Sequence, residues 1–166
     1  MEFDEVLRKR RSIRRYKDTP VPKEKILKML EAARIAPSAS HRQPWHFVVV
    51  ENEEMIKKLA KREWAAEAPA MIVGLADQEA SPSWCINDLG IALEHIVLAA
   101  TNLGLGTCWM GQRGREELVK NLLGIPDDFK VIAVIPIGVP DETPAPKDRK
   151  SLDTIVSWEK YGSKHP

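Results

Sequence analysis

The sequence has two cysteines, almost no net charge and no long hydrophobic run. Cys85 and Cys108 form neither a CxxC pair nor a zinc-ligand spacing, so they predict two free thiols rather than a disulfide framework. The formal net charge is +1, which argues against a general nucleic-acid binder. No apolar run reaches the length of a membrane span, and the first residues lack a signal-peptide core. We therefore expect a cytoplasmic protein without a membrane partner.

The short motifs of common hydrolases and metalloenzymes are also missing. The chain contains no HExxH, GxSxG or EF-hand pattern, and its four histidines show no metal-ligand spacing. His95 lies in an apolar segment, where a buried histidine with a hydrogen-bond partner is the usual case. The sequence therefore predicts no metal site, and it gives no support for a serine, cysteine or metal hydrolase.

The apolar pattern predicts one layered domain that spans residues 1–166, since no linker or repeat divides the chain. Helical spacing predicts helices at residues 2–10, 22–36, 52–62, 88–103 and 116–123, and apolar runs predict strands at 45–51, 70–76, 107–110 and 131–139. Helices that alternate with short strands indicate an α+β or α/β domain. The helix at 88–103 is apolar nearly all round, so it is buried centrally or against a second subunit.

Residues 141–166 differ in character from the rest. Prolines 140, 144 and 146 interrupt structure, and Leu152, Ile155 and Val156 then return at helical spacing, followed by Trp158 and Tyr161. Such an apolar C-terminal extension needs a surface on which to dock.

Two clusters of cations lie far apart in the sequence. The first cluster, residues 8–17, holds seven arginines and lysines together with the hydroxyl of Ser12. The second cluster, residues 147–150, is Lys-Asp-Arg-Lys. A solvated surface is the usual meaning of such a run. Guanidinium groups beside a hydroxyl also suit a phosphate, and the two clusters together would close on a single one. A nucleic-acid patch is a third reading, which the balanced charge disfavours.

Two further segments are candidates for ligand contacts. Residues 37–45, Pro-Ser-Ala-Ser-His-Arg-Gln-Pro-Trp, lie between a helix and a strand, where either a binding loop or a rigid structural connection would lie. Residues 103–111, Leu-Gly-Leu-Gly-Thr-Cys-Trp-Met-Gly, match neither a Rossmann loop nor a P-loop. We expect the second segment to leave backbone amides free near residues 109–111 for a heterocycle.

These segments, in this order, resemble the nitroreductase family of FMN flavoproteins. The match runs through Arg10–Arg14, Ala36–Ser38, Gln43–Trp45, the apolar helix with its Leu-Gly-Leu-Gly end, Thr107–Gly111, Pro136–Gly138 and Arg149–Leu152. It covers nearly the whole chain. The resemblance implies a three-layer α+β fold with a mostly antiparallel sheet of four or five strands flanked by helices. It also implies a homodimer in which residues 141–166 pack on the partner subunit.

The resemblance further implies an FMN site at the dimer interface. Arg10, Ser12 and Arg149, with Lys147, would hold the phosphate, and Arg11 and Arg14 would lie along the phosphate, ribityl chain and pyrimidine edge. A cation at that edge stabilises the negative charge of reduced flavin. The other implied cofactor contacts are the backbone of Met110 and Gly111 near flavin N5, Trp109 beside them, Gln43, and Pro37, Ser38, Ala39 and His41 from the second subunit.

The implied reaction is a ping-pong transfer, in which NAD(P)H gives hydride to flavin N5 and a nitroaromatic, quinone or similar small aromatic acceptor is then reduced. No side chain acts as a nucleophile. Many relatives have Asn where His41 stands, and histidine there is more like the deiodinase branch. Residues 63–83 leave little room for the lid of that branch, so deiodination is not assigned. The alternatives are a flavin storage or sensing protein, a reductive dehalogenase, and a nucleic-acid module.

Overall fold

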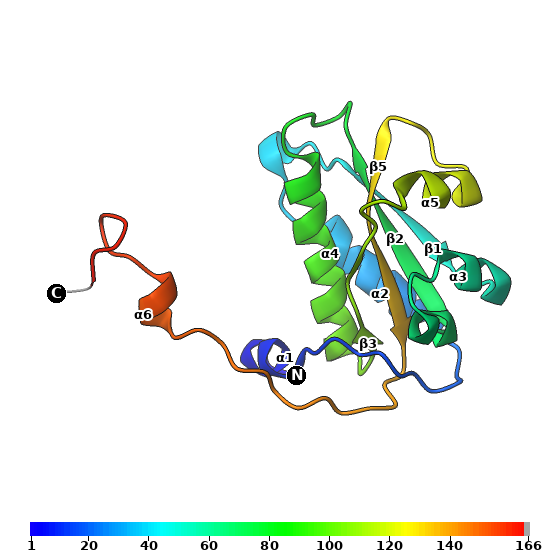
Figure 1. The fold of residues 1–166 in the computed structure, drawn as a ribbon, viewed down its shortest axis with the longest axis horizontal. Coiled ribbons are helices and arrows are strands. Elements are labelled where there is room, and N and C mark those ends of the chain that lie inside the picture. The colour runs from blue at the N-terminus through cyan, green and yellow to red at the C-terminus, as the bar shows by residue number, and fades with distance from the viewer. Residues whose placement is uncertain (165–166) are drawn as a thin grey trace.

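The computed structural model describes residues 1–164, which form a five-stranded sheet covered by helices on both faces (Figure 1). The strands are β1 (Trp45–Val50), β2 (Ala70–Asp77), β3 (Gly106–Thr107), β4 (Met110–Gly111) and β5 (Phe129–Gly138). Their order is β1-β2-β5-β3, and β4 also pairs with β5. All of these pairings are antiparallel, so the predicted sheet is confirmed.

The helices divide between the two faces of the sheet. They are α1 (Phe3–Lys9), α2 (Lys23–Arg34), α3 (Glu53–Leu59), α4 (Cys85–Asn102), α5 (Glu116–Leu123) and α6 (Leu152–Ile155), with short 3-10 helices η1 (Ala39–His41) and η2 (Glu63–Glu67). Helices α2 and α4 cover one face, while α3 and α5 cover the other (Figure 1). The result is the three-layer α+β arrangement predicted from the sequence.

The alternation of side chains along β2 explains why both faces are apolar. Ala70 and Ile72 face the core under α2 and α4, whereas Met71, Val73 and Leu75 face the core under α3 and α5. A strand with two buried faces needs the continuous apolar run that the sequence shows. Asn52 caps α3 through a hydrogen bond that its side chain accepts from the backbone N–H of Met55, as expected from its position.

Helix α4 is the central element of the first core. Leu89, Leu93 and Ile96 are completely buried, and Gly104, just past the helix end, adopts a left-handed φ of 74°. The helix begins one turn earlier than predicted, at Cys85, because the backbone carbonyl of Ser81 already accepts the N–H of Cys85. His95 is half-buried, and its Nδ1 lies 2.9 Å from the carbonyl oxygen of Ala32, which confirms the structural interpretation of this histidine.

The single strand predicted at residues 107–110 is wrong in detail. The chain makes two short pairings with β5, through Gly106–Thr107 and Met110–Gly111, and residues 108–109 lie between them outside the ladder. Gly106 is required at this position because an added Cβ would lie 2.6–2.8 Å from the Cγ1, Cβ and Cγ2 atoms of Ile13. The close approach allows Ser12 to form a parallel bridge with Thr107.

The C-terminal extension leaves the body of the protein after β5 and carries α6 outward (Figure 1). The exposed apolar side chains of Leu152, Ile155, Val156, Trp158 and Tyr161 lie along it. Between 42% and 103% of each of these residues is exposed, which is the pattern expected of a segment that docks elsewhere. Among residues 1–164, no helix is both long enough and apolar enough to cross a membrane.

Candidate functional site

The two cation clusters of the sequence meet in a small hollow. Its volume is about 90 Å³, and it is lined by Arg10, Arg11, Ser12, Arg14, Pro144, Ala145, Lys147 and Arg149. We call this set the cation cradle. None of its lining residues is acidic, although it gathers four guanidinium groups, one ammonium group and a hydroxyl. Like charges repel one another, so an anion would stabilise the cradle, and this donor set fits a phosphate.

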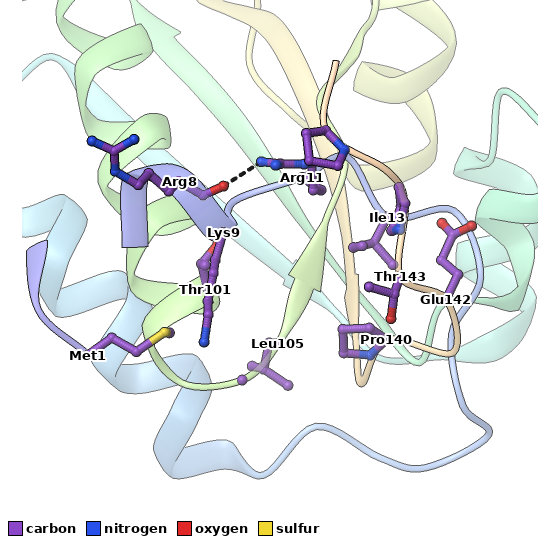
Figure 2. A pocket seen from close by; sticks show the side chains of 13 residues that line it. Met1, Arg8, Lys9, Arg11, Ile13, Thr101, Leu105, Pro140, Glu142 and Thr143 are labelled. Carbon is purple, nitrogen blue, oxygen red and sulfur yellow. Dashed lines mark hydrogen bonds between the residues drawn. The ribbon is translucent and has the colours of Figure 1, made fainter. Parts of the chain in front are cut away.

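Arg11 lies at the border of the cradle and a larger hollow of about 580 Å³ beside α1 (Figure 2). Its Nη1 donates hydrogen bonds to the backbone carbonyls of Arg8 (2.6 Å) and Arg10 (2.8 Å). Its Nε is buried and has no partner within the described residues. Arg11 thus ends α1 and fixes the backbone of the cradle, a role that the cation pattern of the sequence did not indicate.

Glu142 joins the start of the C-terminal extension to the backbone beside Arg14 of the cradle. Its Oε1 accepts hydrogen bonds from the consecutive backbone N–H groups of Arg14 and Arg15. The Arg15 side chain donates in turn to the carbonyl of Asp141 (2.7 Å). These contacts set the direction in which residues 143–149 continue, so Lys147 and Arg149 reach the cradle because the chain is anchored at Glu142.

The turn at residues 106–112 leaves backbone amides free. The N–H of Gln112 donates to the carbonyl of Ile132 in β5. Hydrogen-bonded and non-bonded pairs alternate along an antiparallel ladder. Gly111, paired with Ala133, is therefore a non-bonded position, while Met110, paired with Val134, uses its amide in the ladder. Neither the Trp109 amide nor the Gly111 amide therefore has an acceptor among the described residues, and both residues are exposed.

Trp109 is held beside the cradle by a carboxylate of α4. Its indole Nε1 donates to Glu94 Oε2 (3.3 Å), and the other oxygen of Glu94 lies 4.0 Å from Nε of Arg10. Glu94 therefore links the turn to the cradle. It was missed in the sequence analysis, although a charged residue in the most apolar helix is a recognisable signal.

Two further cations contact the cradle and the turn: Arg14 lines the cradle, and Lys61 contacts Gly111. The Arg14 guanidinium carbon lies 5.8 Å from the centre of the Trp64 ring, a cation–π geometry. Lys61 Nζ donates to the carbonyl of Gly111 (3.1 Å). The backbone of Gly111 thus has the Lys61 ammonium group in contact with it, which favours negative charge nearby.

Burial raises the pKa of the Cys108 thiol above its usual range, although Arg14 and a hydrogen bond with Ser12 oppose this effect. Burial also raises the pKa of Tyr16, whose hydroxyl donates to the carbonyl of Ile13 (2.7 Å). Both groups are therefore neutral at physiological pH. Cys85 and Cys108 are free and buried, as predicted. Within residues 1–164, no three His, Cys, Asp or Glu side chains are arranged to hold a metal ion.

The loop at residues 37–43 is strained. Ser40, His41 and Gln43 have φ values of 51°, 56° and 50°, in the left-handed region that costs a non-glycine residue about 1–3 kcal/mol. The Ser38 hydroxyl accepts the Gln43 amide (2.9 Å), and the amide of Ala39 donates to the Asp88 carboxylate. Pro37, His41 and Gln43 are exposed, and Ser38 and Ala39 are half-buried.

Within one chain, the loop and the cradle lie on different sides of α4. The loop contacts the helix at Asp88, near its first turn, and the cradle approaches Glu94. Six residues separate these positions, so their side chains point about 120° apart around the helix axis. Figure 1 shows η1 at the opposite end of α4 from α1 and the start of the extension. The predicted cofactor contacts thus form two separate groups in one chain.

The fold is a layered α+β domain, and the cradle beside it has a donor set that suits a phosphate. Comparison with known proteins identifies the family. The family model named "Nitroreductase family" matches residues 7–67 and 57–139. The chain therefore belongs to the nitroreductase family, which confirms the sequence-based resemblance and fold. The predicted enzyme class, an NAD(P)H oxidoreductase with FMN as cofactor, is supported at the level of the family.

Individual relatives agree with this assignment. The chain is 39% identical over 164 residues to the "Putative NADH dehydrogenase/NAD(P)H nitroreductase" of Methanothermobacter thermautotrophicus, covering 93% of this chain and 86% of that protein. It is 31% identical to iodotyrosine deiodinase 1 of Rattus norvegicus, covering 93% of this chain and 68% of that protein. An FMN-dependent nitroreductase from Clostridium difficile R20291 has a similar structure, with a TM-score of 0.79, 34% identity and coverage of 96% and 98% of the two chains.

Proposed function

We propose that this protein transfers hydride from NAD(P)H through bound FMN to a nitroaromatic, quinone or similar small aromatic acceptor, in a ping-pong cycle. The observation that carries the proposal is the cation cradle, in which residues 10–14 and 147–149 converge without an acidic lining residue. A phosphorylated cofactor supplies the missing negative charge. The relatives named as nitroreductase and NADH dehydrogenase support the choice of FMN and NAD(P)H.

The cradle fits the FMN phosphate in chemistry as well as in charge. Arg10 and Arg149 would form charge-assisted hydrogen bonds to phosphate oxygens, and the Ser12 hydroxyl would donate another. Lys147 adds a further positive charge. The unpartnered Nε of Arg11 is a buried donor on the border of the same hollow.

When bound, FMN supplies a ring nitrogen that accepts and releases hydride. The protein's own residues bind and orient. The free amide of Gly111 would lie at that nitrogen, and Trp109, held by Glu94, would lie beside it. Arg14, supported by the Trp64 ring, would stabilise negative charge at the pyrimidine edge. No side chain needs to form a covalent intermediate.

The active unit would be a homodimer with FMN at its interface, located in the cytoplasm. The separation of loop 37–43 from the cradle within one chain supports this arrangement, because Pro37, Ser38, Ala39, His41 and Gln43 would then contact the flavin held by the partner. The exposed apolar residues of the extension support it as well, since residues 141–166 would pack on the second subunit.

Reductive dehalogenation is the second candidate, favoured by His41 and by the deiodinase relative. The segment between α3 and α4 weighs against it. That segment holds only η2, β2 and two short turns, which would leave an open site without an inserted lid. An open site suits a broad range of acceptors.

An anaerobic titration tests the proposal. The purified protein should show flavin absorbance, and NADH or NADPH should bleach it; an acceptor panel that includes quinones, nitroaromatics and halogenated phenols should then restore the colour. Flavin that stays oxidised with both donors would indicate a storage or sensing protein instead. A colourless protein that takes up no added FMN would refute the cofactor assignment.

A further inference from the structure

The strained loop needs an external support, because three of its residues occupy the left-handed region without being glycine. Two side chains hold it. Ser38 belongs to the loop itself and accepts the amide of Gln43. Asp88 belongs to α4 and is the contact that ties the loop to a rigid element.

Asp88 is positioned for this one contact. The residue is 4% exposed, and its two carboxylate oxygens lie 3.1 and 3.2 Å from the amide nitrogen of Ala39. Among residues 1–164, none of the ion pairs involves it. Burial of a carboxylate without a neighbouring cation costs free energy. An apolar side chain at this position would pack in the core without that cost. Its presence in an apolar helix therefore points to a role in holding the loop that it contacts.

We infer that Asp88 is a positioning residue, which fixes the loop at residues 38–43 in the shape that contacts the flavin of the partner subunit. The inference rests on the proposed function. It assigns Asp88 to the site of the partner, although Asp88 touches neither cofactor nor substrate. Removal of its carboxylate would leave the amide of Ala39 without its acceptor and let the loop relax toward ordinary backbone angles.

Two variants separate this role from general destabilisation. Asp88→Ala should release FMN about tenfold or more faster than the parent holoprotein, the factor expected for one charge-assisted hydrogen bond. Asp88→Asn keeps an oxygen that can accept the Ala39 amide, so it should stay within about threefold of the parent. Asn52→Ala is the matched control, because it removes another side-chain acceptor of a backbone amide, at the start of α3. It should lower thermal stability and leave FMN release unchanged.

Mixed dimers decide whether Asp88 acts on its own site or on that of the partner. An Asp88→Ala subunit has an intact cradle, and an Arg149→Ala subunit has an intact loop. Coexpression of the two subunits with different tags gives a mixed dimer with two unlike sites. One site combines the intact cradle of the Asp88→Ala subunit with the intact loop of the Arg149→Ala subunit. The other site combines the altered cradle with the altered loop. We expect one tightly bound FMN per mixed dimer and about half of the parental turnover, although each homodimer is defective.

Several results would overturn the inference. These are parental FMN release in Asp88→Ala, a defect in Asp88→Asn as large as in Asp88→Ala, or mixed dimers without a tight site. A failure of the proposed function would give a different result. The Arg149→Ala homodimer, which has a normal loop, would then bind FMN as tightly as the parent protein.

Discussion

Replacement of Gly106 by alanine should weaken the fold and the cofactor site together. The new Cβ would lie 2.6–2.8 Å from three atoms of Ile13, and one of these is the Ile13 Cβ itself. A different rotamer moves the two Cγ atoms but not the Cβ, so the backbone of Ile13 has to shift. The backbone N–H of Ile13 donates a hydrogen bond to the carbonyl of Thr107. Ile13 also lies between two cradle residues, Ser12 and Arg14. Ser12 would therefore move with it.

The size of the effect follows from the contact. Overpacking of a filled core costs about 1–3 kcal/mol. For a chain of this size, that corresponds to a melting temperature lower by about 2–12 °C. Displacement of the Ser12 hydroxyl from a charged phosphate would weaken FMN binding by about ten- to 150-fold. Thermal unfolding of the apoprotein measures the first effect, and a fluorescence titration with FMN measures the second.

Gly74→Ala is the control for this variant. Its Cβ would meet the side-chain end of Leu93, with Cδ1 at 2.8 Å and Cδ2 at 2.9 Å. That end can rotate, and it lies between β2 and α4, away from the cradle. We expect a smaller loss of stability and unchanged FMN affinity. A Gly106→Ala protein that melts and binds FMN like the parent would refute the packing argument, and one that loses stability alone would refute the link to Ser12.

Three other predictions concern single side chains of the site. Arg149→Ala should weaken FMN binding about tenfold or more by fluorescence titration, because it removes a charge-assisted hydrogen bond; unchanged flavin content would contradict the phosphate assignment. Glu94→Gln should strengthen FMN binding by about two- to fivefold, because it removes a negative charge near Arg10 and keeps an acceptor for Trp109; weaker binding would show that the charge is needed. Cys108 should resist iodoacetamide at pH 8 in the folded protein, since burial raises its pKa and the reactive thiolate forms only above that pKa. Mass spectrometry would show the modification rate rising with pH, and rapid labelling at pH 8 would contradict the burial argument.

The sequence was sufficient to predict the helices and strands whose apolar residues recur at a regular helical or strand spacing. The apolar run of β2 and the helical spacing of α2 and α4 predict elements close to the observed ones, because side chains on both faces of β2 enter a core. The turn after α4 was harder. Whether Thr107 and Met110 belong to one strand or two depends on their pairing with β5, which lies more than twenty residues later.

The site was predictable to a similar extent. Residue types alone indicated that the clusters at 10–14 and 147–149 suit one phosphate, and the structure places them around one hollow. The supporting carboxylates were not predicted. Glu94, Asp88 and Glu142 act through hydrogen bonds to groups 15 to 128 residues away, and such pairings have no local signature. Their positions follow only from the packing of α4 and from the path of the extension.

The cradle has a consequence for biosynthesis. All five strands and α1 to α5 have been synthesised before the ribosome reaches Lys147 and Arg149. All of these elements thus precede the second half of the cradle in the chain, so the proposed cofactor site would be complete only after the extension has left the ribosome. A protease that removes the extension would leave a folded but poorly loaded remainder. The flavin content of a preparation would then report the fraction of chains that are intact.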